Sequence, residues 1–388
     1  MKILIGGIPF AAHDLRCEAM YIGTVLAFAE IIPDAEFAFL SECPHYIRSR
    51  FELDSRSAGD FEGIDLYVVL AGTYLIANMP LALSLMEEAA KAGVASVVFD
   101  WDLLPGDPLF QRTFAERYAE RSSWQVRLRL KKEDPEMARA FALQEIFSLA
   151  RAVLVRNSRT FVQLQHFGFE PAGINIDPLY LLPSGDLERA KEVVPEAFWK
   201  TLASDGRLLV ISFALPPEEA KMTEWNSFFT GFLTENPANC IAFFCPASEQ
   251  YRASLFGEEA YSPAVQCFSD YPEPEILQAF LSFANAVISD RREVLIFAAN
   301  SLIPFFALKS DDGSVEPMLE EYGVTFCGSI ANPDFEKLSF SLGLLLTGGE
   351  AMTTELARVR ARILKRKLPL LLDEKNSHKE KFGEVTKS

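Results

Sequence analysis

Residues 65–71, Asp-Leu-Tyr-Val-Val-Leu-Ala, form an apolar run that ends at Gly72. Shorter apolar runs occupy residues 1–5, 95–99 and 152–155. Within each run the apolar residues are continuous rather than alternating with polar ones, which is typical of strands buried on both faces of a parallel sheet. Segments with helical character separate the runs. This half of the chain therefore predicts strands and helices that alternate around one parallel sheet.

A second series of elements begins after the turn sequence Pro-Ser-Gly-Asp at residues 183–186. Its strands are predicted at residues 207–214, 239–245, 265–268, 286–289 and 303–308. The sequence thus predicts two α/β domains, residues 1–184 and 185–350, followed by a basic helix and a polar tail over residues 351–388. Two Rossmann-like domains that face a cleft form the GT-B plan, which is the fold class that we expect.

The composition of the 388 residues, 49% hydrophobic and 23% charged, is that of a globular protein. With 37 Lys and Arg residues against 54 Asp and Glu residues, the formal net charge is −17. A surface that binds nucleic acid needs basic residues to neutralise phosphates, so we expect no nucleic-acid partner. A few arginines in one place are still enough to bind a small anionic substrate.

Six cysteines are scattered without a Cys-x-x-Cys pair, and the chain has only four histidines. We therefore expect reduced thiols in a cytoplasmic protein and no metal site. Gly6-Gly7 is not part of a GxGxxG sequence and no Walker A sequence occurs, so we expect no bound cofactor. Asp100-Trp101-Asp102 follows a predicted strand, but it lacks the context of a sugar-nucleotide metal motif. The N-terminus has no long apolar stretch typical of a signal peptide, and no apolar window reaches the roughly 18 residues of a membrane span.

Residues 355–367 are the most basic segment, with six positive charges and one negative charge. One interpretation is a helix that buries Leu356, Val359, Ile363 and Leu364 and exposes its basic side to water. The other is a peripheral contact with anionic lipid, or with a lipid-linked substrate, at the inner face of the membrane. The sequence leaves both open.

Three segments occur in order along the chain. Residues 14–20, Asp-Leu-Arg-Cys-Glu-Ala-Met, follow the first strand. Residues 152–160, Ala-Val-Leu-Val-Arg-Asn-Ser-Arg-Thr, begin with a strand that is followed by Arg156, and Asp-Pro-Leu-Tyr follows at 177–180. Residues 286–299 contain a strand and then a helix that Arg-Arg-Glu at 291–293 opens, before Ile-Pro at 303–304. In order and spacing, these segments resemble the motifs of the polysaccharide pyruvyl transferase family.

The chain departs from that family at its third motif, where Arg291-Arg292-Glu293 stands in place of Arg-Leu-His. The family's later Tyr-Asp-x-Lys segment is Ser-Asp-Asp-Gly-Ser at 310–314, without the Lys. The resemblance implies transfer of a pyruvyl group from phosphoenolpyruvate, as co-substrate, to a sugar hydroxyl of a cell-surface glycan precursor. Two alternatives are a GT-B glycosyltransferase that uses a nucleotide sugar, and a catalytically inactive relative that binds a glycan or a partner protein.

The candidate anion-binding residues at the third motif are Arg291, which the family shares, and its neighbour Arg292. Arg291 lies where a strand gives way to a helix, so backbone N–H groups would point at the same anion. Glu293 is a candidate general acid or base on the substrate hydroxyl, and Asp290 with Glu293 also forms a capping-box pattern. A carboxylate beside a phosphate would repel it unless protonated or turned away.

Further candidates follow the first strand and the strand that ends at residue 155, where ligand sites of α/β sheets lie. Arg156 and Arg159 are expected to bind the substrate, or else to form a salt bridge that crosses between the domains. After the first strand, Asp14 and Glu18 are candidate catalytic residues, and His13 and Arg16 are candidate substrate-binding residues. The structural alternative for Glu18 is capping of a helix start.

Overall fold

The computed structural model describes residues 1–7, 10–72, 79–103, 135–166, 168–202, 205–348 and 350–365. These residues group into two compact units. Unit 1 contains residues 1–12 and 20–181, and unit 2 contains residues 13–19 and 182–364. The chain passes from unit 1 to unit 2 three residues before the predicted boundary at 184.

Unit 1 is built on a seven-stranded sheet with the order β3-β2-β1-β4-β5-β6-β7, in which all pairings are parallel. Its strands are β1 (Lys2–Gly6), β2 (Glu36–Leu40), β3 (Asp54–Arg56), β4 (Leu66–Gly72), β5 (Ala95–Trp101), β6 (Ala150–Val155) and β7 (Gly173–Ile174). The run at 65–71 corresponds to β4, all seven residues of which are buried. Both faces of this central strand are covered, which explains its continuous apolar sequence.

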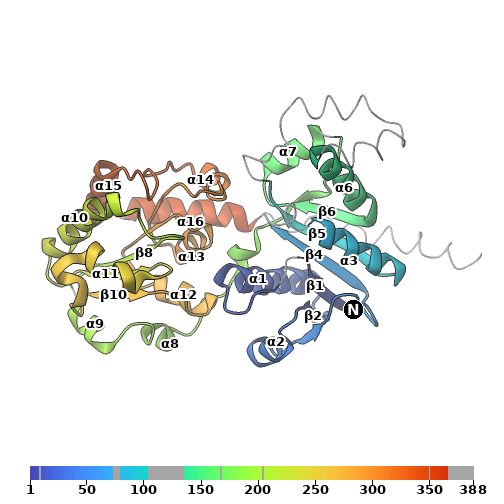
Figure 1. Ribbon diagram of the computed structural model, residues 1–388, viewed down its shortest axis with the longest axis horizontal. Coiled ribbons are helices and arrows are strands. Elements are labelled where there is room, and N and C mark those ends of the chain that lie inside the picture. Colours follow the sequence, from blue (N-terminus) through green and yellow to red (C-terminus); the bar gives the residue numbers. More distant parts are fainter. Residues whose placement is uncertain are drawn as a thin grey trace, which may run out of the picture. The chain divides into compact units, whose positions relative to one another are not determined.

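The helices of unit 1 are α1 (Leu15–Ile31, with Met20 onward in this unit), α2 (Pro44–Phe51), α3 (Met79–Lys91), α6 (Pro135–Leu149), α7 (Ser158–His166) and the 3₁₀ helix η2 (Pro178–Leu181). Helices α3 and α6 pack together against β4, β5 and β6 (Figure 1). Helix α1 lies so close to η2 that a Cβ atom at Gly23 would be 2.0 Å from the carbonyl oxygen of Pro178. Only glycine fits this position.

Unit 2 contains a five-stranded parallel sheet with the order β10-β9-β8-β11-β12. Its strands are β8 (Leu208–Ser212), β9 (Cys240–Phe244), β10 (Val265–Phe268), β11 (Ala286–Ser289) and β12 (Phe305–Ala307). Its helices are α8 (Leu187–Lys191), α9 (Glu196–Thr201), α10 (Glu219–Glu235), α11 (Ser248–Phe256), η3 (Gly257–Tyr261), α12 (Pro274–Leu281), α13 (Arg292–Asn300), α14 (Glu316–Tyr322), α15 (Phe335–Gly348) and α16 (Glu350–Leu364). The strand order reverses between β8 and β11. In an open parallel sheet, the crevice beyond the carboxyl ends at such a reversal is the usual ligand position.

The predicted basic helix is α16, which lies against α13 and α14 and so belongs to unit 2. Leu356, Val359 and Ile363 are buried. Arg358 pairs with Glu355 on the exposed side. Residues 366 and 367 of the basic segment lie outside the described residues. None of the described helices combines the length and the apolar composition that crossing a membrane requires.

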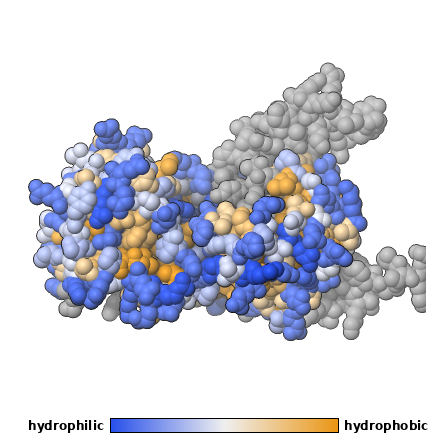
Figure 2. All heavy atoms as spheres, turned by 60° about the horizontal axis from the view of Figure 1, so that its bottom comes forward, coloured by the Kyte–Doolittle hydropathy of each residue, from blue (hydrophilic) through white to orange (hydrophobic). Residues whose placement is uncertain are grey.

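The surface carries apolar side chains as well as charged ones. On the face seen in Figure 2, hydrophilic residues surround hydrophobic patches. Leu215 is a large exposed apolar residue, with 60% of its surface accessible. Because it follows β8 by three residues, Leu215 lies near the carboxyl edge of the unit 2 sheet.

Candidate functional site

The carboxyl ends of β8 and β11 are joined by hydrogen bonds from polar residues. The hydroxyl of Ser289, the last residue of β11, donates to the carbonyl oxygen of Ser212 at 2.8 Å. The same hydroxyl accepts from the N–H of Arg291 at 2.9 Å. Oδ1 of Asp290 accepts from the N–H of Ala214 at 2.8 Å. The two loops at the strand-order reversal are therefore held in one arrangement.

Tyr271 and Arg291 form a stack beside these loops. The hydroxyl of Tyr271 is 2.8 Å from Oγ of Ser212, and its ring stacks on Phe244 with a centroid distance of 5.3 Å. The guanidinium of Arg291 lies 4.6 Å from the centre of the Tyr271 ring, within the range of a cation–π contact. Burial raises the pKa of Tyr271 to about 12, so its hydroxyl is neutral at physiological pH.

Glu293 is the ionic partner of Arg291. Its side chain is 6% exposed, and Nε and Nη2 of Arg291 both lie 2.6 Å from its Oε1. Burial alone would raise the pKa of Glu293, but the charge of Arg291, and then that of Arg16, outweighs burial and lowers it. Glu293 is therefore ionised. Arg291 is the N-cap of α13 and Asp290 precedes it, so the predicted capping box with Asp290 as N-cap is wrong.

Asp290 has properties that the sequence pattern did not reveal. The residue is 7% exposed, and burial raises its pKa to about 7 against the opposing hydrogen bond from Ala214. A carboxyl group with this pKa exists in both protonation states near neutral pH, as a general acid or base requires. Asp290 is thus a candidate catalytic group that sequence reasoning treated only as a helix cap.

Arg16 is brought close to Glu293 within unit 2. The charge of Arg16 adds to that of Arg291 in lowering the pKa of Glu293, and it makes a smaller contribution to lowering the pKa of Asp312. For Asp312, burial opposes the lowering, and hydrogen bonds with Ser314 are its main cause. The structure therefore groups Arg16 with Arg291 and Glu293, three of the residues singled out from the sequence. Arg292 follows Arg291 but is buried within α13.

The other candidates after the first strand form the start of α1. Oδ1 of Asp14 accepts from the N–H of Cys17, and Oε1 of Glu18 accepts from the N–H of His13, both at 2.7 Å. Glu18 is buried, whereas Asp14 and His13 are exposed. These contacts are those of a capped helix start, the structural alternative, and the catalytic roles of Asp14 and Glu18 remain predictions.

Arg156 lies in unit 1, in a buried cluster of acids. Its guanidinium is 5% exposed and pairs with Asp100, with Asp102 at 3.1 Å and with Asp177 at 3.6 Å. Burial alone would lower the pKa of Arg156, but the charges of Asp100 and Asp102 raise it. The partners all belong to unit 1, so Arg156 forms a salt bridge within one unit and not the domain-crossing one that was the alternative. Arg159, on α7, is half-buried and has no ion-pair partner among the described residues.

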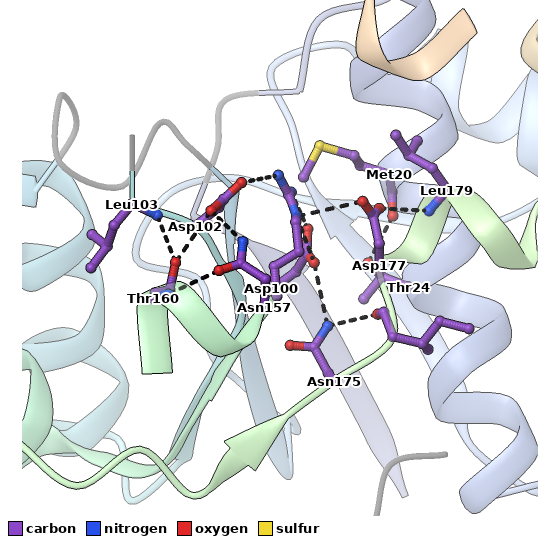
Figure 3. A network of polar contacts seen from close by, with 12 residues as sticks. Met20, Thr24, Asp100, Asp102, Leu103, Asn157, Thr160, Asn175, Asp177 and Leu179 are labelled. Atoms are coloured by element: carbon purple, nitrogen blue, oxygen red, sulfur yellow. Dashed lines mark hydrogen bonds and ion pairs between the residues drawn. The ribbon is translucent and has the colours of Figure 1, made fainter. Parts of the chain in front are cut away.

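Amide and hydroxyl groups complete this cluster, as Figure 3 shows. Asn157 donates to Asp102 at 2.8 Å, and the Thr160 hydroxyl donates to Asp102 at 3.2 Å. Asn175 donates to Asp100 at 3.3 Å. Asp100 has a φ of 62°, an uncommon value for a residue with a side chain. The network joins the ends of β5 and β6 to the segment after β7.

Metal ligands and paired cysteines are not found in the parts of the chain that the structure describes. No group of three or more His, Cys, Asp or Glu side chains there is arranged to hold a metal ion. The six cysteines are free thiols, and all except Cys43 are buried. Asp100 and Asp102 both pair with Arg156.

No protein-family model matches the sequence, and no curated protein matches it. Solved structures do match. The UDP-GlcNAc 2-epimerase of Neisseria meningitidis bound to UDP-GlcNAc has a TM-score of 0.53 at 10% identity, over 94% of this chain and 99% of that one. A UDP-glucosyltransferase from Polygonum tinctorium has a TM-score of 0.53 at 12% identity, over 95% of this chain and 93% of that one. The glycosyltransferase VinC in complex with dTDP has a TM-score of 0.53 at 14% identity, over 95% of this chain and 96% of that one.

The chain has the GT-B fold. The predicted fold class, with two Rossmann-like domains, is confirmed. At these low identities the comparisons establish the fold alone. Of the groups at the candidate site, Ser212 and Tyr271 were missed by sequence reasoning. The available signal was position, because Ser212 ends β8 and Tyr271 follows β10 by three residues.

Proposed function

We propose that this protein is an enzyme that uses a nucleotide sugar, of the glycosyltransferase or epimerase type. The observation that carries the proposal is the polar cluster at the strand-order reversal of unit 2, on a GT-B fold. Parallel α/β sheets bind their ligands at this position. Similar structures with this fold include an enzyme bound to UDP-GlcNAc and one in complex with dTDP.

The residues of the cluster suit the uncharged parts of such a ligand. Arg291 presents a planar guanidinium, 19% exposed, that already stacks on Tyr271, and a nucleobase can stack on the same group. Asp290 is able to accept a hydrogen bond from a sugar hydroxyl and, with a pKa of about 7, to take up its proton. The exposed Leu215 adds apolar surface nearby.

A thermal melting screen tests the proposal. UDP-, GDP- and dTDP-sugars are compared with phosphoenolpyruvate and inorganic phosphate. One nucleotide sugar should raise the Tm by several degrees, because a ligand at about 100 times its Kd adds about 2.7 kcal/mol of stability. Arg291→Ala should abolish the rise. Arg189→Ala should keep it, since Arg189 is a surface residue of unit 2 that pairs with Glu273.

Pyruvyl transfer stays a second hypothesis, which rests on the sequence resemblance. A rise in Tm with phosphoenolpyruvate alone would favour it over the nucleotide-sugar proposal. No rise with any of these compounds would favour the inactive, glycan-binding or partner-binding alternative. Contact of residues 355–367 with lipid, and a lipid-linked acceptor, likewise stay predictions.

A further inference from the structure

We propose that the carboxylate of Glu293 is a built-in anion that excludes phosphate groups from the first turn of α13. Where the proposed function holds, the part of the nucleotide sugar that faces this turn is then an uncharged one, the nucleoside or the sugar. The ligand class rests on the proposed function, whereas the exclusion of phosphate does not. The contacts of Glu293 carry the inference.

The first step concerns the local electrostatics of α13. The N-terminal turn of a helix presents free N–H groups and favours negative charge. The side chain of the N-cap residue, Arg291, accepts no hydrogen bond from the backbone N–H groups of this turn. Glu293 lies within the turn, and its carboxylate is hydrogen-bonded by its own backbone N–H. The negative charge that the turn favours is therefore supplied by the chain itself.

The second step concerns the cations that a phosphate would need. Arg291 directs both Nε and Nη2 at Oε1 of Glu293, each at 2.6 Å. The charge of Arg16 also acts on Glu293, and it contributes to lowering the pKa of that carboxyl. A phosphate placed here would compete for the same guanidinium groups. It would also lie beside a buried, ionised carboxylate, where like charges repel most strongly.

The third step concerns the groups around the ion pair. Near Arg291 the structure has the Tyr271 ring and hydroxyl and the Ser212 hydroxyl. Ala214 and Leu215 are exposed in the loop held by Asp290. Hydroxyl, aromatic and aliphatic groups are suited to hydroxyl-bearing and planar uncharged ligands. The two hydroxyls are hydrogen-bonded to each other, and the side chains of Ala214 and Leu215 offer a phosphate no donor.

The experiment measures binding of inorganic phosphate to the full-length chain by calorimetry and by the shift in Tm, at constant ionic strength. Glu293→Ala and Glu293→Gln each remove the built-in charge. Both variants should bind phosphate at least about tenfold more tightly than the unaltered chain. The Tm of the unaltered chain should not change when phosphate is added. If Glu293→Ala fails to fold, the test rests on phosphate binding by Glu293→Gln, because Gln keeps the side-chain size and an acceptor for Arg291.

Glu219→Ala is the matched control. Glu219 also lies in the first turn of a unit 2 helix, α10, but its side chain is exposed. An equal gain in phosphate binding by Glu219→Ala would overturn the inference, because net charge alone would then explain it. Equal phosphate binding by the unaltered chain and both Glu293 variants would overturn it too.

The two proposals fail separately. A gain in phosphate binding by the Glu293 variants, without any nucleotide-sugar response of the unaltered chain, would support the exclusion role and contradict the proposed function. A rise in Tm of the unaltered chain with a nucleotide sugar, without a gain in phosphate binding by the Glu293 variants, would support the proposed function and contradict the exclusion role.

Discussion

Replacing Asp290 by Asn should make the protein more stable at alkaline pH and leave it unchanged in acid. Asp290 is buried, and its Oδ1 accepts a hydrogen bond from Ala214 at 2.8 Å. Burial raises its pKa from the ordinary value of 3.8 to about 7. Asn keeps an oxygen that can accept the same hydrogen bond, has nearly the same size and carries no charge at any pH. The substitution therefore isolates the cost of ionising this carboxyl group.

The size of the effect follows from the two pKa values. Between about pH 4 and pH 7, the folded protein holds a proton on Asp290 that the unfolded chain has lost. Stability from this group is fully present below the unfolded pKa and declines as the pH rises, until the folded pKa is passed. The values differ by about three pH units, and one unit corresponds to about 1.4 kcal/mol, so the total is about 4 kcal/mol.

Urea denaturation of both proteins at about pH 4.5, 6, 7 and 8 provides the measurement. The stability of Asp290→Asn relative to the unaltered chain should rise by about 1.4 kcal/mol per pH unit up to pH 7 and then level off. Asp270→Asn, at an exposed position, should show no such trend. Parallel curves for Asp290→Asn and the unaltered chain would refute the reasoning. A less stable variant at pH 8 would mean that Arg291 stabilises the ionised carboxylate.

Two further predictions concern unit 1, with controls from either unit, and both are measured by urea denaturation. Arg156→Leu should lose about 3–5 kcal/mol, because it leaves buried carboxylates without their partner, whereas Arg159→Leu should change stability by less than about 1 kcal/mol. A loss of the same size in both would contradict the ion-pair cluster. Gly23→Ala should lose at least about 1–3 kcal/mol by collision with Pro178, whereas Gly231→Ala, in α10 with open space around it, should gain about 0.5–1 kcal/mol. Two gains would contradict the close approach at Gly23.

The strands were predictable because burial on both faces leaves a direct trace in the sequence. Every residue of β4 is buried, and the continuous run at 65–71 reflects that requirement. Local pattern likewise placed Arg291 and Glu293 at the start of a helix. The residues that surround them were not predictable in the same way. Tyr271 reaches Ser212 from 59 positions away along the chain, so no local window contains the contact.

Arg156 shows why position at a strand end is insufficient to identify a ligand-binding arginine. Its local sequence, an apolar strand followed by Arg, is the same whether the guanidinium meets a ligand or an acid. The deciding partner, Asp100, is 56 residues earlier in the sequence. A chain with a net charge of −17 has many acids available for such pairing. In an acidic protein, an arginine at a sheet edge is therefore weak evidence for an anion site.

The two arginines differ in ways that favour unit 2 as the place to look for a ligand. Three carboxylates surround Arg156, which is 5% exposed, so its donors are used within the fold. Among the described residues Arg291 pairs with one carboxylate, and it is 19% exposed, with its guanidinium 4.6 Å from the centre of the Tyr271 ring. A guanidinium neutralised by one acid attracts a phosphate weakly, but its plane can still stack and its remaining N–H groups can still donate. The ion pair with Glu293 thus weakens the case for a phosphate-binding arginine. Under the proposed function, Arg291 is better suited to the uncharged end of a nucleotide sugar.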